Sequence, residues 1–435
     1  MKQGSKPHYL VLSLFLFAIL ASGCGNLPGA SLFNSDPFLI PNASGSTVSL
    51  PTMSGANVLP LTVNGGLCSS NSYANKPCVA VTICPAGVSS SSLPNSSCQT
   101  ITDVLVDTGS VGLRVFKSAL NTTLLNSLSS VMAHGKPVAE CVSFGDGSSD
   151  WGSVQVANVV LGNESAVQVP IHVIESGYAT APSACSGANQ NPVTAGYTAI
   201  LGVGLFKQDC GSSCAPLSSG GGMYFTCSGS TCTGSSVQLS DQVANPVSAL
   251  PQDNNGVIVR LPNVPAGGVV TANGYLVLGI GTQSNNTPPG VQTYFADPVY
   301  GEFSTDFNGH TYPSSYIDSG SNGLFFQPDQ AGLFPDCSSS DSRLAKWFCP
   351  ASTQSFTASM TDSSGLTTTT VPFQIGNMFN LYVNSPSNVL VESGANLSDG
   401  KQSFDWGLPF FMGKDVYVGI EGTSSTLGAG PYWAF

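Results

Sequence analysis

The chain has 435 residues and a formal net charge of −12, yet only 8% of its residues are Asp, Glu, Lys or Arg. This acidic balance, with no basic cluster, argues against a nucleic-acid-binding protein. A 41% hydrophobic content excludes a disordered chain, and 49 glycines among many Ser, Thr and Asn residues favour turn-rich β structure over helix bundles.

The N-terminus has the features of an export signal. Lys2 and Lys6 precede the apolar run YLVLSLFLFAIL, whose 12 residues are too few to span a bilayer. The small residues at 21–23 lead to Cys24, a pattern that resembles the lipobox of bacterial lipoproteins, and Gly25 resembles outer-membrane sorting. We therefore expect residues 1–23 to be a lipoprotein signal peptide and Cys24 to carry the lipid, with an ordinary cleaved signal peptide as the alternative.

A tether and a series of short strands follow. Residues 24–55 are rich in Ser, Pro, Gly and Asn, which predicts a tether between the lipid and the folded body. Beyond it, short apolar runs alternate with turn residues and predict a predominantly β protein. The clearest runs are VLVDT (104–108), SVQVANVVL (153–161), VQVPIHVI (167–174), AILGVG (199–204), GVIVRLP (256–262), GYLVLGIG (274–281), TTVPFQIG (369–376) and DVYVGIEG (415–422).

One segment has helical spacing. Leu120, Leu124, Leu128 and Val131 share one helical face, which predicts a helix over residues 117–132. The acidic side chains Asp146 and Asp150 lie in a Gly- and Ser-rich stretch and are expected to be solvated turn residues.

Twelve cysteines remain of the 13 once Cys24 is set aside, and an even number in an exported chain predicts disulfide bonds. The near pairs Cys210–Cys214, Cys227–Cys232 and Cys337–Cys349 are the expected bridges, while the sequence leaves the rest of the connectivity open. A metal site is not expected, because no C-x₂-C pair is present and the four histidines are scattered. No cofactor is expected either.

An internal repeat is the most informative feature. The stretch DTGSVGLRVF (107–116) aligns with DSGSNGLFFQ (318–327), and each copy follows an apolar run and precedes a possible helix. The aligned pairs are Asp107/Asp318, Gly109/Gly320, Ser110/Ser321, Gly112/Gly323 and Leu113/Leu324. The repeat predicts two halves that each donate one aspartate.

Two carboxyl groups held close together share one proton, because both cannot ionise cheaply. Such a pair can deprotonate a water and protonate the oxygen of an attacked amide. Gly109 and Gly320 allow close backbone approach, and Ser110 and Ser321 can orient the carboxylates. Asp107 and Asp318 are therefore the candidate catalytic residues, supported by Thr108, Gly109, Ser110, Ser319, Gly320 and Ser321.

With these motifs the chain resembles the pepsin-like aspartic peptidases. The resemblance implies an all-β fold with two lobes related by a pseudo-twofold axis and a few short helices. It places the N-terminal lobe at 56–287 and the C-terminal lobe at 288–435. AILGVG with Gly202, and DWGLPFF with Gly407, resemble the strands that pass beneath the two catalytic loops. SFGDGSSDWG (143–152) resembles the flap hairpin that closes over substrate.

Two departures from that family concern the flap. The family has a flap Tyr that bonds to a Trp after the first catalytic loop, and the matching residues here are Phe144 and Arg114. Phe144, Gly145, Asp146 and Arg114 are accordingly candidate substrate-binding residues. An inward Arg114 would lower the pKa values of the dyad, whereas a surface Arg114 would be inert.

Three functions are open at this point. The first is an exported aspartic endopeptidase, monomeric and lipid-anchored at the bacterial outer membrane, that holds a polypeptide in the cleft between its lobes. The second is a catalytically inactive binding protein of the cell envelope on the same scaffold, with a peptide, polysaccharide or protein ligand. The third is a structural envelope protein in which the two Asp-containing turns lie far apart.

Overall fold

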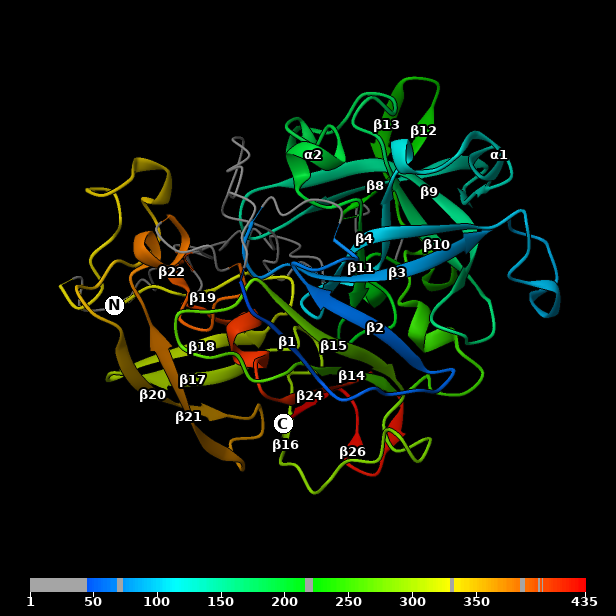
Figure 1. Cartoon of the computed structure of the whole chain (residues 1–435). Helices are drawn as coiled ribbons and strands as arrows, with labels where there is room; N and C mark the ends of the chain where they lie inside the picture. Colours follow the sequence, from blue (N-terminus) through cyan, green and yellow to red (C-terminus); the bar gives the residue numbers. More distant parts are fainter. Residues whose placement is uncertain are drawn as a thin grey trace, which may run out of the picture.

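The structure is a computed structural model that describes residues 45–68, 73–215, 222–328, 332–383, 388–397, 400 and 402–435. The expected signal peptide, Cys24 and most of the expected tether lie outside these residues. The described chain is predominantly β, as the sequence predicts, and its helices are short (Figure 1). In this part of the chain, no helix has the length and apolar character needed to cross a membrane.

Four strands surround Asp107. β11 (Ala199–Val203) lies between β4 (Gln99–Asp107), with which it is parallel, and β5 (Val111–Phe116), with which it is antiparallel. β10 (Val167–Ile174) then pairs with β5 in parallel. In this register Gly202 lies opposite Asp107, so a glycine of the inserted strand passes beside the end of the aspartate's strand.

Four other strands repeat this arrangement around Asp318. β23 (Phe404–Trp406) lies between β18 (His310–Ile317), which is parallel to it, and β19 (Leu324–Phe326), which is antiparallel. β22 (Gly394–Asn396) pairs with β19 in parallel. The order along the chain and the direction of every pairing match those of β4, β5, β10 and β11.

Strands from both ends of the chain extend the sheet that contains the strands around Asp107. The strands β2 (Val58–Val63), β15 (Thr271–Leu278), β14 (Gly256–Arg260), β24 (Asp415–Gly419), β27 (Tyr432–Ala434) and β16 (Thr293–Phe295) pair antiparallel in that order. Strands from both sides of the expected 287/288 boundary therefore share one sheet. Figure 1 shows β14, β15 and β24 below the strands around Asp107, with β17–β22 to one side.

The remaining elements complete the two groups of strands. A hairpin of β8 (Lys136–Ser143) and β9 (Ser149–Val160) carries the stretch expected to be the flap. The other strands are β1 (Thr47–Ser49), β3 (Pro77–Cys84), β6 (Ser129–Ser130), β7 (Met132–Ala133), β12 (Tyr224–Ser228), β13 (Thr231–Gly234), β17 (Phe303–Phe307), β20 (Gln354–Thr361), β21 (Thr368–Ile375), β25 (Ser424–Ser425) and β26 (Gly428–Ala429). The two α-helices among the described residues are α1 (Thr122–Leu125) and α2 (Pro192–Ala195).

The helix predicted over 117–132 is wrong. Only α1 and a short 3₁₀ turn form there, and β6 already pairs with β9. The segment is rich in Ser, Thr and Asn, whose side chains compete for backbone hydrogen bonds; Ser127 Oγ, for example, donates to Leu124 O over 2.6 Å. Leu124 is still buried, so the apolar residues face the core without a helix.

One further expectation needs correction. Residues 47–49, which the sequence places in the tether, form β1 and pair in parallel with β15. The possible helix after the first copy of the repeat is the 117–132 segment, and residues 329–331 after the second copy lie outside the described residues.

Disulfides and aromatic packing support the two groups. The three predicted bridges, Cys210–Cys214, Cys227–Cys232 and Cys337–Cys349, are confirmed. Three more join Cys68–Cys78, Cys84–Cys98 and Cys141–Cys185. Beneath Asp318 the core is aromatic, with edge-to-face contacts of Phe307 to Phe326, Phe334, Phe356, Phe373 and Phe404.

Gly407 provides a test of this packing. A Cβ added there would lie 2.0 Å from Gly323 O and 2.7 Å from Ser321 O, both backbone atoms of the turn after Asp318. We expect Gly407→Ala to lower the free energy of unfolding by about 3 kcal/mol or more, because backbone cannot move aside as a side chain can. Urea denaturation of the variant beside Gly187→Ala, where a Cβ meets open space, measures this; equal midpoints for the two variants would contradict the packing described.

Candidate active site

Each candidate aspartate lies where a buried strand meets a tight turn. Asp107 is the last residue of β4, and Asp318 follows the last residue of β18. The turn residues then bind the carboxylate: Gly109 N donates to Asp107 Oδ1 over 2.8 Å, and Gly320 N donates to Asp318 Oδ1 over 2.7 Å. Both carboxyl groups are buried, with 0% of each residue exposed.

The outer oxygens are held by the two serines. Ser110 Oγ donates to Asp107 Oδ2 over 2.6 Å. Ser321 Oγ lies 2.9 Å from Asp318 Oδ2. The structure thus shows the orienting hydrogen bonds that the residue types suggest.

The two carboxyl groups meet. A Cβ added to Gly109 would lie 2.6 Å from Asp318 Cγ, and one added to Gly320 would lie 2.9 Å from Asp107 Cγ. The two side chains are also hydrogen-bonded to each other. Each glycine therefore makes room for the carboxyl group of the opposite turn, which no larger residue could do.

The two carboxyl groups titrate as a pair. Burial raises the pKa of Asp107 by more than the hydrogen bonds from Asp318, Ser110 and Gly109 lower it. For Asp318, burial is followed by the negative charges of Asp107 and Asp405, and together they hold its pKa well above the usual range. Because both pKa values are raised, the pair favours holding one shared proton.

Reciprocal hydrogen bonds lock the two turns together. Thr108 N donates to Ser319 Oγ over 3.1 Å, and Ser319 N donates to Thr108 Oγ1 over 2.9 Å. Each hydroxyl then donates across to the strand before the other aspartate, Thr108 Oγ1 to Ile317 O over 3.0 Å and Ser319 Oγ to Val106 O over 2.7 Å. All four bonds join parts of the chain more than 200 residues apart, so they fix the separation of the carboxyl groups.

The site contains a third carboxylate, which the sequence motifs did not predict. Asp405 lies on β23 opposite Tyr316, and its Oδ2 is 2.5 Å from Ser321 Oγ. Its charge raises the pKa of Asp318. The signal in the sequence was its position in the motif DWG. Asp405 is two residues before Gly407, the glycine that passes beneath the Asp318 turn.

The β8–β9 hairpin tip contains the remaining candidates. Gly145 is exposed, and Asp146 is half-buried. Burial raises the pKa of Asp146 to about 6. Phe144 is only 4% exposed and packs in a cluster that includes Phe116 and Tyr197, so nearly all of its surface is used by the core and little is left for a ligand.

Arg114 is neither a surface residue nor a partner of the dyad, which corrects both expectations for it. Its guanidinium is 1% exposed and lies 2.6 Å from Glu140 Oε1 and 2.8 Å from Asp209 Oδ2. Burial lowers the pKa of Arg114, but these two carboxylates raise it by more. Arg114 therefore stabilises a buried ion cluster, and a substrate-binding role for it stays a prediction.

The expectation that Asp150 is solvated is also wrong. Its side chain is 0% exposed, accepts a hydrogen bond from Asn189 Nδ2 over 2.9 Å and lies 3.1 Å from Tyr197 Oη. Burial raises its pKa to about 6. Asp150 lies near the start of β9, after the turn. Its Gly and Ser neighbours in the sequence therefore did not indicate that its side chain is exposed.

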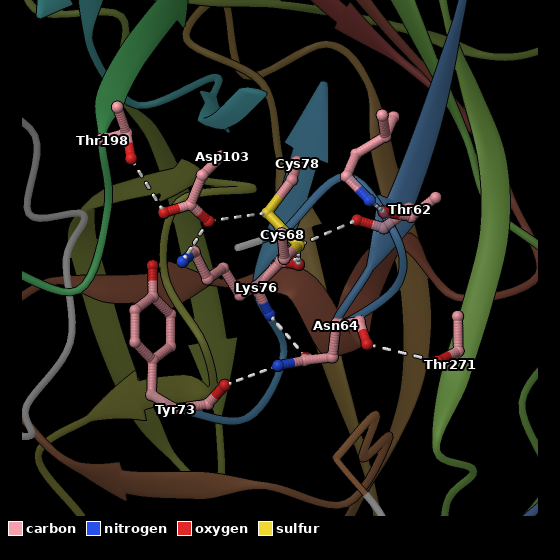
Figure 2. Close-up of a disulfide and its surroundings, with 10 residues drawn as sticks. Thr62, Asn64, Cys68, Tyr73, Lys76, Cys78, Asp103, Thr198 and Thr271 are labelled. Carbon is pink, nitrogen blue, oxygen red and sulfur yellow. Dashed lines mark hydrogen bonds and ion pairs between the residues drawn. A yellow bond between two sulfur atoms is a disulfide. The ribbon is translucent and has the colours of Figure 1, made fainter. Parts of the chain in front are cut away.

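One group of described residues has the composition of a metal site. Cys68, Cys78 and Asp103 lie together, but the two sulfurs form a disulfide bond (Figure 2). Lys76 forms an ion pair with Asp103 over 2.5 Å, so the carboxylate already has a cation. Disulfide sulfur is not a thiolate ligand, and this cluster therefore stabilises the loop instead of holding a metal.

Comparison with known proteins adds a family. A family model described as "Protein of unknown function (DUF3443)" matches residues 53–435, which include both aspartates and every strand from β2 to β27. No curated protein matches the chain.

The hydroxyl of Thr108 provides a test of how the turns are held. We expect Thr108→Val to lower the free energy of unfolding by about 2–4 kcal/mol, because it leaves Ser319 N–H and Ile317 C=O buried without their partner. Thr100→Val on the same strand is the control, since Thr100 is exposed and its change should stay within about 0.5 kcal/mol. Equal losses in urea denaturation would show that the reciprocal bonds contribute nothing special.

Proposed function

We propose that the chain, which belongs to the DUF3443 family, is an aspartic-type endopeptidase that hydrolyses peptide bonds with Asp107 and Asp318. One observation carries the proposal: two buried carboxyl groups from matching turns meet and share a hydrogen bond. The third hypothesis, a structural protein with distant turns, expects the opposite geometry. A resident metal or a covalent intermediate is not needed by this chemistry.

The chemistry follows from the shared proton. The ionised carboxylate of the pair accepts a proton from a water, whose oxygen bonds to the carbonyl carbon of the peptide. The proton on the other carboxyl group passes to the carbonyl oxygen, so that a neutral tetrahedral diol forms. In its collapse the C–N bond breaks, the leaving amine takes the proton that the pair received from water, and one hydroxyl of the diol returns a proton to the other carboxylate, which leaves a carboxylic acid product and restores the pair.

The proposed fold is a two-lobed, pepsin-like one with the site between the lobes. Its support is the matched set of strands, β4, β5, β10 and β11 against β18, β19, β22 and β23, with the same order and the same pairing directions. In this proposal a polypeptide lies extended between the lobes, and the protein acts as a monomer. The hairpin of β8 and β9 is the flap.

A second candidate function rests on burial. Both carboxyl groups are 0% exposed, and Phe144 at the hairpin is committed to the core. A protein that holds a ligand near the dyad without turnover, as an envelope binding protein, would tolerate such closure. It predicts that ligand capture survives loss of either aspartate.

Replacement of the aspartates separates these functions. We expect Asp107→Asn and Asp318→Asn each to reduce cleavage of a mixed peptide library at least 10²-fold, because each removes one member of the acid–base pair. The wild-type rate should fall as the pH rises through the raised pKa of the pair, because the proton that the pair supplies is then lost. Mass spectrometry of the digest measures both, with circular dichroism as the control for folding. A wild-type protein that captures peptides without cutting them would support the binding function.

We also propose that the protein is exported and anchored by a lipid on Cys24, in the outer membrane of a bacterial envelope. The support is the signal-like segment before Cys24 and the residue that follows it. Labelled palmitate should enter the wild-type protein and not Cys24→Ser, which should leave the membrane fraction. Equal labelling of the two proteins would contradict the anchor.

A further inference from the structure

Tyr73 has a buried hydroxyl group that the fold leaves without a hydrogen bond among the described residues. The residue is 1% exposed, and among the described residues its hydroxyl has no hydrogen-bond partner. A buried polar atom left unpaired costs free energy, and such atoms are uncommon in native proteins. The hydroxyl therefore needs an explanation, and a ligand that is absent from the structure is one.

The backbone around Tyr73 is held firmly (Figure 2). Asn64 Nδ2 donates to Tyr73 O over 2.7 Å, Lys76 N donates to Asn64 Oδ1 over 3.0 Å, and Asn64 N donates to Lys76 O over 2.9 Å. The disulfide between Cys68 and Cys78 lies beside this network. The backbone carbonyl of Tyr73 is thus fixed by a hydrogen bond, while its hydroxyl has none among the described residues.

The segment also reaches the turn of the second aspartate. Asn75 Nδ2 donates to Asn322 O over 2.9 Å, and Leu390 N donates to Asn75 Oδ1 over 2.7 Å. Asn322 directly follows Ser321, the residue that orients Asp318. Tyr73 is therefore two residues from a clamp that ties the start of β3 to the Asp318 turn.

Acidic groups influence the phenol. Burial raises the pKa of Tyr73 well above its usual value, and the charges of Asp103, Asp107, Asp146 and Asp318 raise it further. These charges include those of both candidate aspartates and of the hairpin tip. Asp103 is already engaged by Lys76 and by Thr198 Oγ1. Tyr73 remains a neutral phenol and can act as a hydrogen-bond donor.

We propose that the Tyr73 hydroxyl donates a hydrogen bond to the carbonyl oxygen of a peptide bound at Asp107 and Asp318, and holds that oxygen as it becomes tetrahedral. This inference rests on the function proposed above. Phe144, at the hairpin, has no polar atom with which to make such a bond. A donor that is unpaired before binding gains most when the substrate arrives, because no existing hydrogen bond must be broken.

Tyr73→Phe tests the proposal, since it removes only the oxygen. We expect kcat for peptide cleavage to fall about 10²-fold with a smaller change in KM, as for loss of one donor to a developing oxyanion. The melting temperature should stay the same or rise, because an unpaired buried hydroxyl is removed.

Tyr224→Phe is the matched control. Its hydroxyl is buried too, but it donates to Asp209 over 2.6 Å and accepts from Val243 N over 2.7 Å, away from the dyad. This variant should have a lower melting temperature and an unchanged kcat. A fall in the melting temperature of Tyr73→Phe as large as that of Tyr224→Phe would assign the Tyr73 hydroxyl to folding and overturn the proposal.

The outcomes separate this inference from the proposed function. If the wild type cleaves peptides and Tyr73→Phe cleaves them equally well, the role of Tyr73 is wrong and the peptidase function stands. If the wild type does not cleave, calorimetry with a statine-type peptide, which carries a secondary alcohol in place of the scissile amide, decides. Weaker binding by Tyr73→Phe then supports the donor without hydrolysis, whereas equal binding, or no binding by either protein, overturns it.

Discussion

The reciprocal hydrogen bonds between Thr108 and Ser319 are the constraint on which the site depends. Each residue uses its amide and its hydroxyl to bind the other turn and the strand that leads to it. Two carboxyl groups placed together in a buried region repel each other when both are ionised, so some other interaction must keep them there. The four bonds supply it, and the small residues Gly109 and Gly320 leave the space in which the carboxyl groups meet.

Several acidic side chains are buried in the part of the chain that contains Asp107. Asp107, Glu140, Asp150 and Asp209 are all 0% exposed. Their charges are managed in different ways: Arg114 forms ion pairs with Glu140 and Asp209, amide and phenol donors hold Asp150, and Asp107 shares a proton with Asp318. Glu140 and Asp209 are also hydrogen-bonded to each other, but Arg114 is bound to both of them. Among the described residues no cation forms an ion pair with Asp107 or Asp318, and this difference distinguishes the candidate active site from a structural ion cluster.

The sequence identified the aspartates and their neighbours because the repeated Asp-x-Gly-Ser turn is a local signal that occurs twice. It also gave the β class, since short apolar runs with turn residues between them carry that information locally. The helix predicted at 117–132 failed because pairing with β9 overrides the spacing of four apolar residues. Arg114, Asp150 and Asp405 could not be placed, because their partners are distant in sequence. Burial of a polar side chain is decided by those partners and is invisible along the chain.

The separation of the two carboxyl groups in a crystal structure of the protein, determined at atomic resolution, tests the account most directly. The account predicts Asp107 and Asp318 oxygens within hydrogen-bonding distance of each other or of one common water, with Thr108 and Ser319 bonded across the turns. Unequal C–O bond lengths at that resolution would also show which of the two carboxyl groups carries the proton. Either carboxyl group turned toward bulk solvent, or paired with a cation in place of the other aspartate, would contradict the shared-proton pair and the hydrolysis proposed for it.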